Sequence, residues 1–191
     1  MKLAVKVIFC LIISAIIGVG SALAVVKFRT TQLGTTNGPW QYNILTGNKD
    51  ADIYTRAAIA RVGLFALEKS ESIYFLTLRD SAGDRLEDTC RYRISGSPLT
   101  SRWWSVTLYA EDNYLLPNDA NVHSVTSTSL ELDPDDKFTV NIGPQPTDGN
   151  WLPNENAGKF NLILRLYNPD ASIYNAMETV ALPDIEKKGC K

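Results

Sequence analysis

The segment Lys159–Tyr167 reads KFNLILRLY and alternates in character along its whole length. Successive side chains of a β-strand point to opposite faces, so a strand here would present two different faces. One face carries only large apolar residues, namely Phe160, Leu162, Leu164 and Leu166. The other face is mixed and carries Asn161, Ile163, Arg165 and Tyr167. The segment therefore predicts a strand that lies over a hydrophobic core and has a second, partly covered face.

Arg165 lies in the middle of the mixed face, and we expect it to be at least half buried. A buried guanidinium without a partner is costly, so it needs a carboxylate or several carbonyl groups. Glu71 and Asp112 are the first candidates for that partner. Trp104 or Trp151 is expected to stack on the guanidinium.

Further segments with the composition of short strands surround this one: 73–78, 90–94, 103–109, 122–132 and 137–142. The turn residues Asp80–Asp84 and Asp133–Asp136 separate some of them. The first two are expected to pair as a hairpin around the first turn. Many short strands after a single helix predict a mainly β protein, an antiparallel β-sandwich resembling a jelly roll.

A helical pattern precedes these strands. Apolar residues recur there at steps of three and four, at Ile53, Ala57, Ala60, Leu64 and Leu67. This spacing predicts one amphipathic helix that ends near Glu68 or Lys69, with Asp50 or Asp52 as its N-terminal cap. Residues 30–50 are rich in Gly, Pro and small polar residues, which is typical of a linker. Four residues are expected to tack this linker onto the domain: Trp40, Tyr42, Ile44 and Leu45.

The stretch Val7–Val26 reads VIFCLIISAIIGVGSALAVV and carries no charge. A helix of about 20 apolar residues spans a bilayer. A signal peptide has a shorter apolar region, of about 7 to 15 residues, although Ala22-Leu23-Ala24 would suit a signal peptidase. We expect an inner-membrane anchor with its N-terminus inside and the C-terminal domain in the periplasm. The alternative is an exported soluble form cleaved after Ala24.

These patterns divide the chain into an anchor or signal segment (1–29), a linker (30–50), a β-sandwich domain (51–183) and a polar tail (184–191). Cys190 lies in this tail, and Cys90 lies in a predicted strand. In an oxidising compartment the two cysteines could form a disulfide, whereas a mobile tail would leave them free. Cys10 is interpreted as a membrane-facing thiol.

The chain has 191 residues, with 19 Lys and Arg against 21 Asp and Glu, and a formal charge of −2. Without clustered basic residues we expect no nucleic-acid partner. A single histidine, His123, argues against a transition-metal site or a Ser-His-Asp triad. Neither glycine-rich phosphate-binding motif occurs, so we expect no cofactor. Carboxylate pairs for glycoside hydrolysis would be sought first at Glu68, Glu71 and Asp112.

Three phrases are distinctive: Trp104–Tyr109 (WSVTLY), Asn150–Pro153 (NWLP) and Leu164–Pro169 (LRLYNP). With the upstream segment Glu71–Phe75 (ESIYF), they resemble the family called domain of unknown function 1214. The resemblance covers about residues 40–183 and implies a jelly-roll-like sandwich with no assigned reaction. In longer relatives a family 1254 domain precedes this one, and here the apolar segment takes its place.

These phrases supply six candidate ligand-binding residues: Trp104, Tyr109, Asn150, Trp151, Arg165 and Tyr167. An aromatic floor with Arg and Asn suits a small molecule such as a sugar or a carboxylate. Alternatively, the same residues lock a sandwich edge through packing. The sequence thus favours a non-catalytic envelope module that binds a ligand or partner. The alternative is a hydrolase-like enzyme that acts on a sugar or another small envelope substrate.

Overall fold

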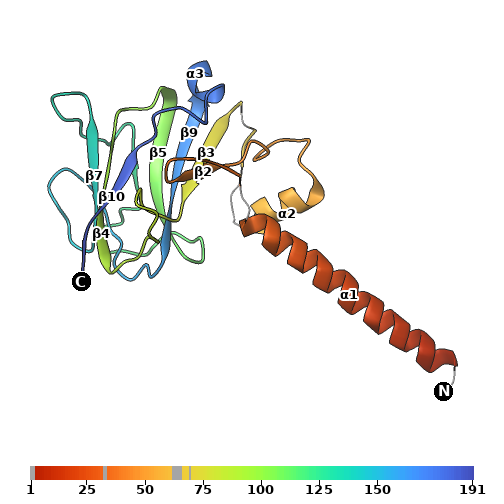
Figure 1. Cartoon of the computed structure of the whole chain (residues 1–191). Coiled ribbons are helices and arrows are strands. Elements are labelled where there is room, and N and C mark those ends of the chain that lie inside the picture. The colour runs from red at the N-terminus through yellow and green to blue at the C-terminus, as the bar shows by residue number, and fades with distance from the viewer. Residues whose placement is uncertain (1–2, 32–33, 62–65, 69) are drawn as a thin grey trace.

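The computed structural model describes residues 3–31, 34–61, 66–68 and 70–191, which form two β-sheets and three helices (Figure 1). The larger sheet has the order β1 (Thr35–Asn37), β2 (Trp40–Tyr42), β3 (Ser72–Thr77), β9 (Phe160–Pro169), β5 (Ser101–Ala110), β6 (Ser124–Thr126). The smaller sheet has the order β10 (Asp184–Cys190), β4 (Cys90–Gly96), β7 (Phe138–Ile142), β8 (Asn150–Leu152). The helices are α1 (Leu3–Thr31), α2 (Ile53–Arg61) and α3 (Ala171–Tyr174).

The mainly β architecture with two sheets is confirmed, with one correction to the pairing. Neighbouring strands run antiparallel except β7 and β8, which are parallel. The finer assignment to a jelly roll stays a prediction, as do the domain boundaries.

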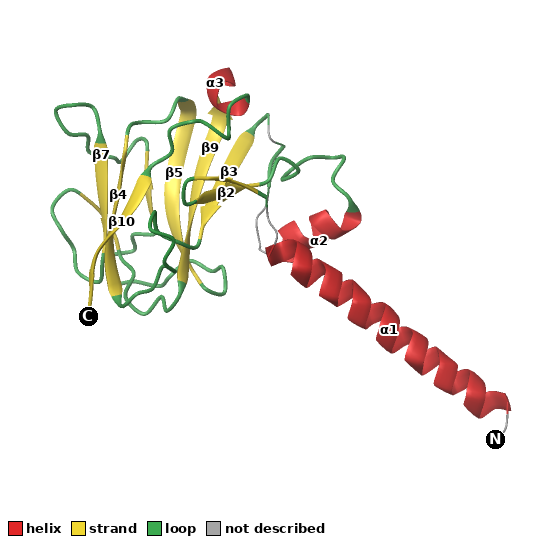
Figure 2. Ribbon diagram, in the orientation of Figure 1, coloured by secondary structure: helices red, strands yellow, loops and turns green. Residues whose placement is uncertain are grey.

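The two sheets face each other and share one hydrophobic core (Figure 2). Aromatic rings join them: the ring centroids of Trp104 and Phe138 are 5.2 Å apart. Those of Tyr92 and Phe160 are 5.8 Å apart. The apolar face predicted for KFNLILRLY lies in this core, because Phe160, Leu162, Leu164 and Leu166 are all 0% exposed.

The predicted hairpin between the first two strands is wrong. β3 pairs with β2 and β9, whereas β4 pairs with β10 and β7 in the other sheet. The turn at Asp80–Asp84 is closed by a short antiparallel bridge between Arg79 and Arg85. Beyond this bridge the chain passes from one sheet to the other, so a turn in the sequence did not imply a shared sheet.

The C-terminal segment, predicted as a polar tail, forms the edge strand β10. Its residue Ile185 is completely buried, and the strand pairs with β4 along most of its length. Cys190 lies directly opposite Cys90, and a disulfide joins the two. The next pair is hydrogen-bonded, because the N–H of Lys191 donates to the carbonyl of Thr89 over 2.9 Å. The cysteines therefore form a non-hydrogen-bonded pair, in which the side chains come closest.

The linker residues 34–50 are part of the structure. Trp40 is 0% exposed, and its indole N–H donates to the carbonyl of Pro183 over 2.7 Å. Tyr42 is also buried, so the prediction that these two residues tack the linker onto the domain is confirmed. Ile44, which is 54% exposed, does not contribute as predicted.

The cap of α2 was predicted correctly, but its apolar stripe was not. The Asp52 carboxylate accepts hydrogen bonds from the N–H groups of Tyr54 and Thr55. Ile53 is 74% exposed, whereas Thr55 and Ala58 are buried. The segment Ala66–Glu68 is not helical, and Leu64 lies outside the described residues. α2 lies beside α1, away from the sandwich core, which explains why the expected stripe finds no core to cover (Figure 1).

Helix α1 projects away from the sandwich (Figure 1). Its side chains from Leu3 to Phe28 are exposed, apart from the partly buried Val26. It is long enough and apolar enough from Leu3 to Phe28 to cross a membrane. An N-terminal signal sequence meets the same criteria, so α1 is compatible with both predicted fates of the leader.

Candidate functional site

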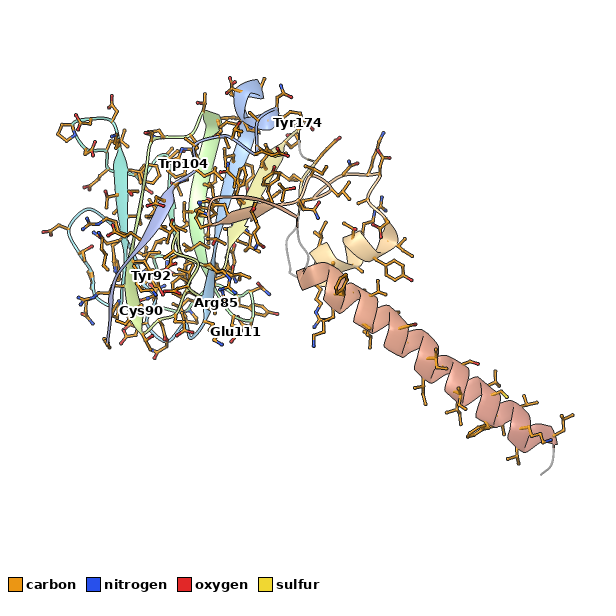
Figure 3. All side chains as sticks on the ribbon, in the orientation of Figure 1. Arg85, Cys90, Tyr92, Trp104, Glu111 and Tyr174 are labelled. Atoms are coloured by element: carbon orange, nitrogen blue, oxygen red, sulfur yellow. A yellow bond between two sulfur atoms is a disulfide. The ribbon has the colours of Figure 1, made fainter. Side chains whose placement is uncertain are left out.

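The structure distributes the six predicted ligand-binding residues over three places. Trp104 is 2% exposed and lies in the core between the sheets (Figure 3). Asn150 and Trp151 belong to β8 in the four-stranded sheet. The remaining three, Tyr109, Arg165 and Tyr167, share the outer face of the six-stranded sheet, on β5 and β9. The six residues therefore do not form one site.

Strand alternation explains this separation. Trp104 and Tyr109 are an odd number of residues apart on β5, so their side chains leave the sheet on opposite faces. The indole that shares the face of Tyr109 belongs to Trp103, which sequence reasoning missed. Counting in steps of two from Tyr109 would have found it.

We call the outer row on β5 and β9 the outer strip. It consists of four cross-strand pairs, Trp103–Tyr167, Ser105–Arg165, Thr107–Ile163 and Tyr109–Asn161. Aromatic rings lie at its two ends, and the guanidinium of Arg165 lies between them. On its other side Arg165 is paired with Tyr74 of β3.

The contacts of Arg165 in the outer strip are with hydroxyl groups. Its Nη2 donates to Oη of Tyr109 over 2.9 Å, and its Nη1 donates to Oγ1 of Thr107 over 3.4 Å. Its Cζ lies 5.3 Å from the centroid of the Tyr109 ring, within the range of a cation–π contact. The stacking ring is thus Tyr109, and not Trp104 or Trp151 as predicted.

The predicted carboxylate partner of Arg165 is not observed. No ion pair formed by the described residues includes Arg165. Glu71 and Asp112 are both exposed, and the Asp112 carboxylate accepts from the N–H of Tyr114 in its own turn. Glu68 is exposed as well. The partial burial of Arg165 agrees with the prediction.

This arrangement is rich in hydrogen-bond donors. A guanidinium carries five N–H donors, and Arg165 uses only two of them here. Because Tyr109 and Thr107 accept from Arg165, their own O–H groups are directed elsewhere. Neither hydroxyl donates to another group among the residues that the structure describes. Three guanidinium N–H groups and two hydroxyl groups of the outer strip therefore remain for an acceptor from outside.

The outer strip is not an ordinary solvent face. Ser105, Thr107 and Asn161 are at most 6% exposed, although they point away from the core. The N–H of Leu67 donates to the hydroxyl of Tyr74 over 3.0 Å, so the segment after α2 reaches this face. Within the described chain, Oδ1 of Asn161 is buried and accepts no hydrogen bond. A buried acceptor of this kind calls for a bound water or ligand group.

An aromatic pair adjoins the guanidinium in the outer strip. The ring centroids of Trp103 and Tyr167 are 5.4 Å apart, and the rings are tilted by 59°. Both residues are partly exposed. The outer strip can therefore hold an anionic group at Arg165 and a flat apolar body at the neighbouring rings.

Asn150 has a structural role in a different place. Its amide donates to the carbonyls of Glu131 and Thr139, and its Oδ1 accepts from the N–H of Glu131. The side chain thus joins three backbone groups of two other segments. Among the described residues, no group of three His, Cys, Asp or Glu side chains is close enough to hold a metal ion.

Comparisons with known proteins agree with this architecture. A family model described as "Protein of unknown function (DUF1214)" matches residues 71–171, a segment that contains β3, β5 and β9. The crystal structure of the VPA0106 protein from Vibrio parahaemolyticus is similar, with a TM-score of 0.60 and 28% identity over 73% of this chain. A putative uncharacterized protein from Burkholderia cenocepacia has a TM-score of 0.49 and 16% identity over 90% of this chain. This chain covers 36% and 50% of those two chains. No curated protein matches.

Proposed function

We propose that this domain, which belongs to the DUF1214 family, is a module that binds a small organic carboxylate. Its outer strip lies within the segment that the family model matches. In the proposed arrangement α1 anchors the protein in the inner membrane, and the sandwich from β1 to β10 lies in the periplasm. Cleavage after Ala24 would release the same module as a soluble periplasmic protein.

One observation carries this proposal: Arg165 has hydroxyl neighbours but no carboxylate among the described residues. A partly buried guanidinium is ordinarily neutralised by an acid of the same chain. Here the guanidinium and the hydroxyls of Tyr109 and Thr107 converge as donors, which suits the oxygens of a bound carboxylate. Trp103 and Tyr167 then contact the apolar part of the ligand. We expect aromatic carboxylates to fit this surface best.

The test is binding of benzoate and phenylacetate to the full chain in detergent micelles, by calorimetry. Arg165→Met keeps most of the side-chain volume and removes the charge. A hydrogen bond to a charged group contributes about 1.5–3 kcal/mol, so we expect a loss of affinity of about tenfold or more. Tyr109→Phe removes one hydroxyl and should weaken binding less. Arg102→Gln, an exposed arginine elsewhere on β5, is the matched control.

A purely structural Arg165 gives a different result. In that case Arg165→Met would lower expression and thermal stability, and the wild-type chain would not bind either probe. That outcome would reject the binding function. Incubation with an ester of the same acid separates binding from hydrolysis. A hydrolase would release a product from the ester, and chromatography would detect it.

A further inference from the structure

The outer face of the four-stranded sheet carries a second, separate row of residues. Arg93 on β4 lies opposite Asn141 on β7, and Asn141 lies beside Trp151 on β8. Arg91 on β4 and Lys188 on β10 flank this row. We call these five residues the Arg–Trp face. It lies on the other sheet and does not depend on the outer strip.

Two arginines of the Arg–Trp face are free cations. Arg91 and Arg93 are exposed, and neither guanidinium group forms a hydrogen bond or ion pair with any residue that the structure describes. Lys188 is paired with Glu186. Both arginines and Lys188 line a hollow of about 250 Å³, and no carboxylate belongs to its described lining. The hollow is therefore electrostatically suited to an anion.

Gly143 lines this hollow and has no side chain, so the stem of Arg91 can lie close to its backbone. A Cβ placed on Gly143 would lie 3.4 Å from Cγ of Arg91, so the arginine stem runs beside a residue without a side chain. The indole N–H of Trp151 donates to the carbonyl of the same glycine over 3.0 Å. Gly143 thus connects the cationic part of the face to the aromatic part.

Trp151 lines a second hollow of about 360 Å³ that adjoins the first one. Pro144 and Gln145 belong to both hollows. The walls of the second hollow combine proline rings with polar side chains, among them Pro146, Pro153, Asp119, Glu155 and Asn156. A fixed indole with carboxylate and amide groups around it is suited to the apolar ring face and the hydroxyl groups of a sugar.

We propose that the Arg–Trp face binds an acidic oligosaccharide. One sugar ring lies on Trp151, its hydroxyls donate to Asp119 or Glu155, and a carboxylate further along the chain meets Arg91 and Arg93. Adjacent strands are about 4.8 Å apart, so β8 and β4 are separated by about 10 Å. A single ring on Trp151 does not reach the arginines, whereas an oligosaccharide does.

An anionic membrane surface is the competing ligand for a cationic face. Figure 1 shows the four-stranded sheet on the side of the sandwich away from α1. A membrane crossed by α1 would therefore not lie against Arg91 and Arg93. The indole with acidic neighbours at the other end of the face also favours a sugar over a lipid headgroup.

The experiment measures binding of a short oligogalacturonate to the full chain in nanodiscs of neutral lipid. We expect Arg91→Gln/Arg93→Gln to weaken this binding about tenfold or more, and Trp151→Leu to weaken it independently. The double variant Arg102→Gln/Lys159→Gln removes two exposed charges elsewhere and should bind as the wild type does. Benzoate, the probe of the outer strip, should not compete with the oligogalacturonate, which separates this site from the outer strip.

Three results would overturn the inference, and a fourth would contradict its carboxylate assignment. The first is equal binding of oligogalacturonate by wild type and by Arg91→Gln/Arg93→Gln. The second is equal binding of a neutral dextran oligosaccharide, which would show that the arginines do not select an anion. The third is binding to vesicles of anionic lipid without binding to the oligosaccharide. A heparin-derived oligosaccharide is the sulfated probe, and its affinity is compared with that of oligogalacturonate. Tighter binding of the sulfated probe would contradict the carboxylate assignment.

Discussion

Removal of the Cys90–Cys190 disulfide should destabilise the domain strongly. The two cysteines are separated by 100 residues in the sequence, so the bond closes a loop that includes most of the sandwich. The chain-entropy model gives about 4.7 kcal/mol for a loop of this size, and measured losses are about 2–5 kcal/mol. β10 is the edge strand that the bond fastens, and Ile185 of this strand lies in the core. We therefore expect a loss near the upper end of that range.

The assay is thermal unfolding of the full chain in detergent, followed by fluorescence of the buried indoles of Trp40 and Trp104. For a chain of this size about 1 kcal/mol corresponds to a shift of about 2–4 °C. Cys90→Ser/Cys190→Ser should thus lower the midpoint by roughly 10–20 °C, and a reductant should do the same to the wild type. Cys10→Ser is the control. A midpoint within about 2 °C of the wild type, or free thiols at both positions by mass mapping, would refute the reasoning.

Three further predictions concern acid stability, packing and the anchor. A hydrogen bond from Lys187 holds the pKa of Asp84 below its ordinary value, so the unfolded chain takes up more protons in the window between the two values. This contribution to stability is present above about pH 3.9 and is lost as the pH falls through the lowered pKa; Asp84→Asn should flatten that limb of an acid titration, and an unchanged limb would contradict it. Leu164→Ala at a fully buried position should cost about 2–5 kcal/mol in urea unfolding, and a loss below about 1 kcal/mol would be inconsistent with the core described. The protein should resist alkaline extraction from membranes, whereas a soluble form that begins at Val25 would show cleavage after Ala24.

Local alternation was sufficient to predict β9 and its two faces, whereas the strand predicted over 122–132 is wrong in length, because only Ser124–Thr126 is a strand. From Phe160 to Tyr167 each side chain lies on the face that period two assigns to it. The adjacent β5 was predicted as a strand, but its faces were not assigned. Pairing was not predictable, because the partners of β3 are separated widely in sequence: Tyr74 lies opposite Arg165. The turn at Asp80–Asp84 suggested that β3 pairs with β4. The two strands lie instead in different sheets, which bury their apolar faces in one core.

Composition misled the prediction where tertiary contacts determine structure. Residues 184–190 are mostly polar, and only Ile185 indicates a buried face, yet the open edge of β4 holds the segment as a strand. In α2 the spacing of apolar residues was helical, but Ile53 lies on the exposed side. At the candidate site, Tyr167 was predicted because it lies in the same short sequence phrase as Arg165. Finding Trp103 required counting in steps of two along β5 from Tyr109.

The position of β10 after all other strands in the chain has a consequence for the timing of folding. During synthesis β4 and β7 are complete long before β10, so one edge of β4 has no partner in the meantime. Open edges of this kind pair readily with other chains. The edge of β4 stays unpaired until β10 pairs with it. The disulfide between Cys90 and Cys190 then makes this pairing difficult to reverse. Slow synthesis or a reducing environment should therefore increase aggregation before the chain is complete, even where the finished protein is stable.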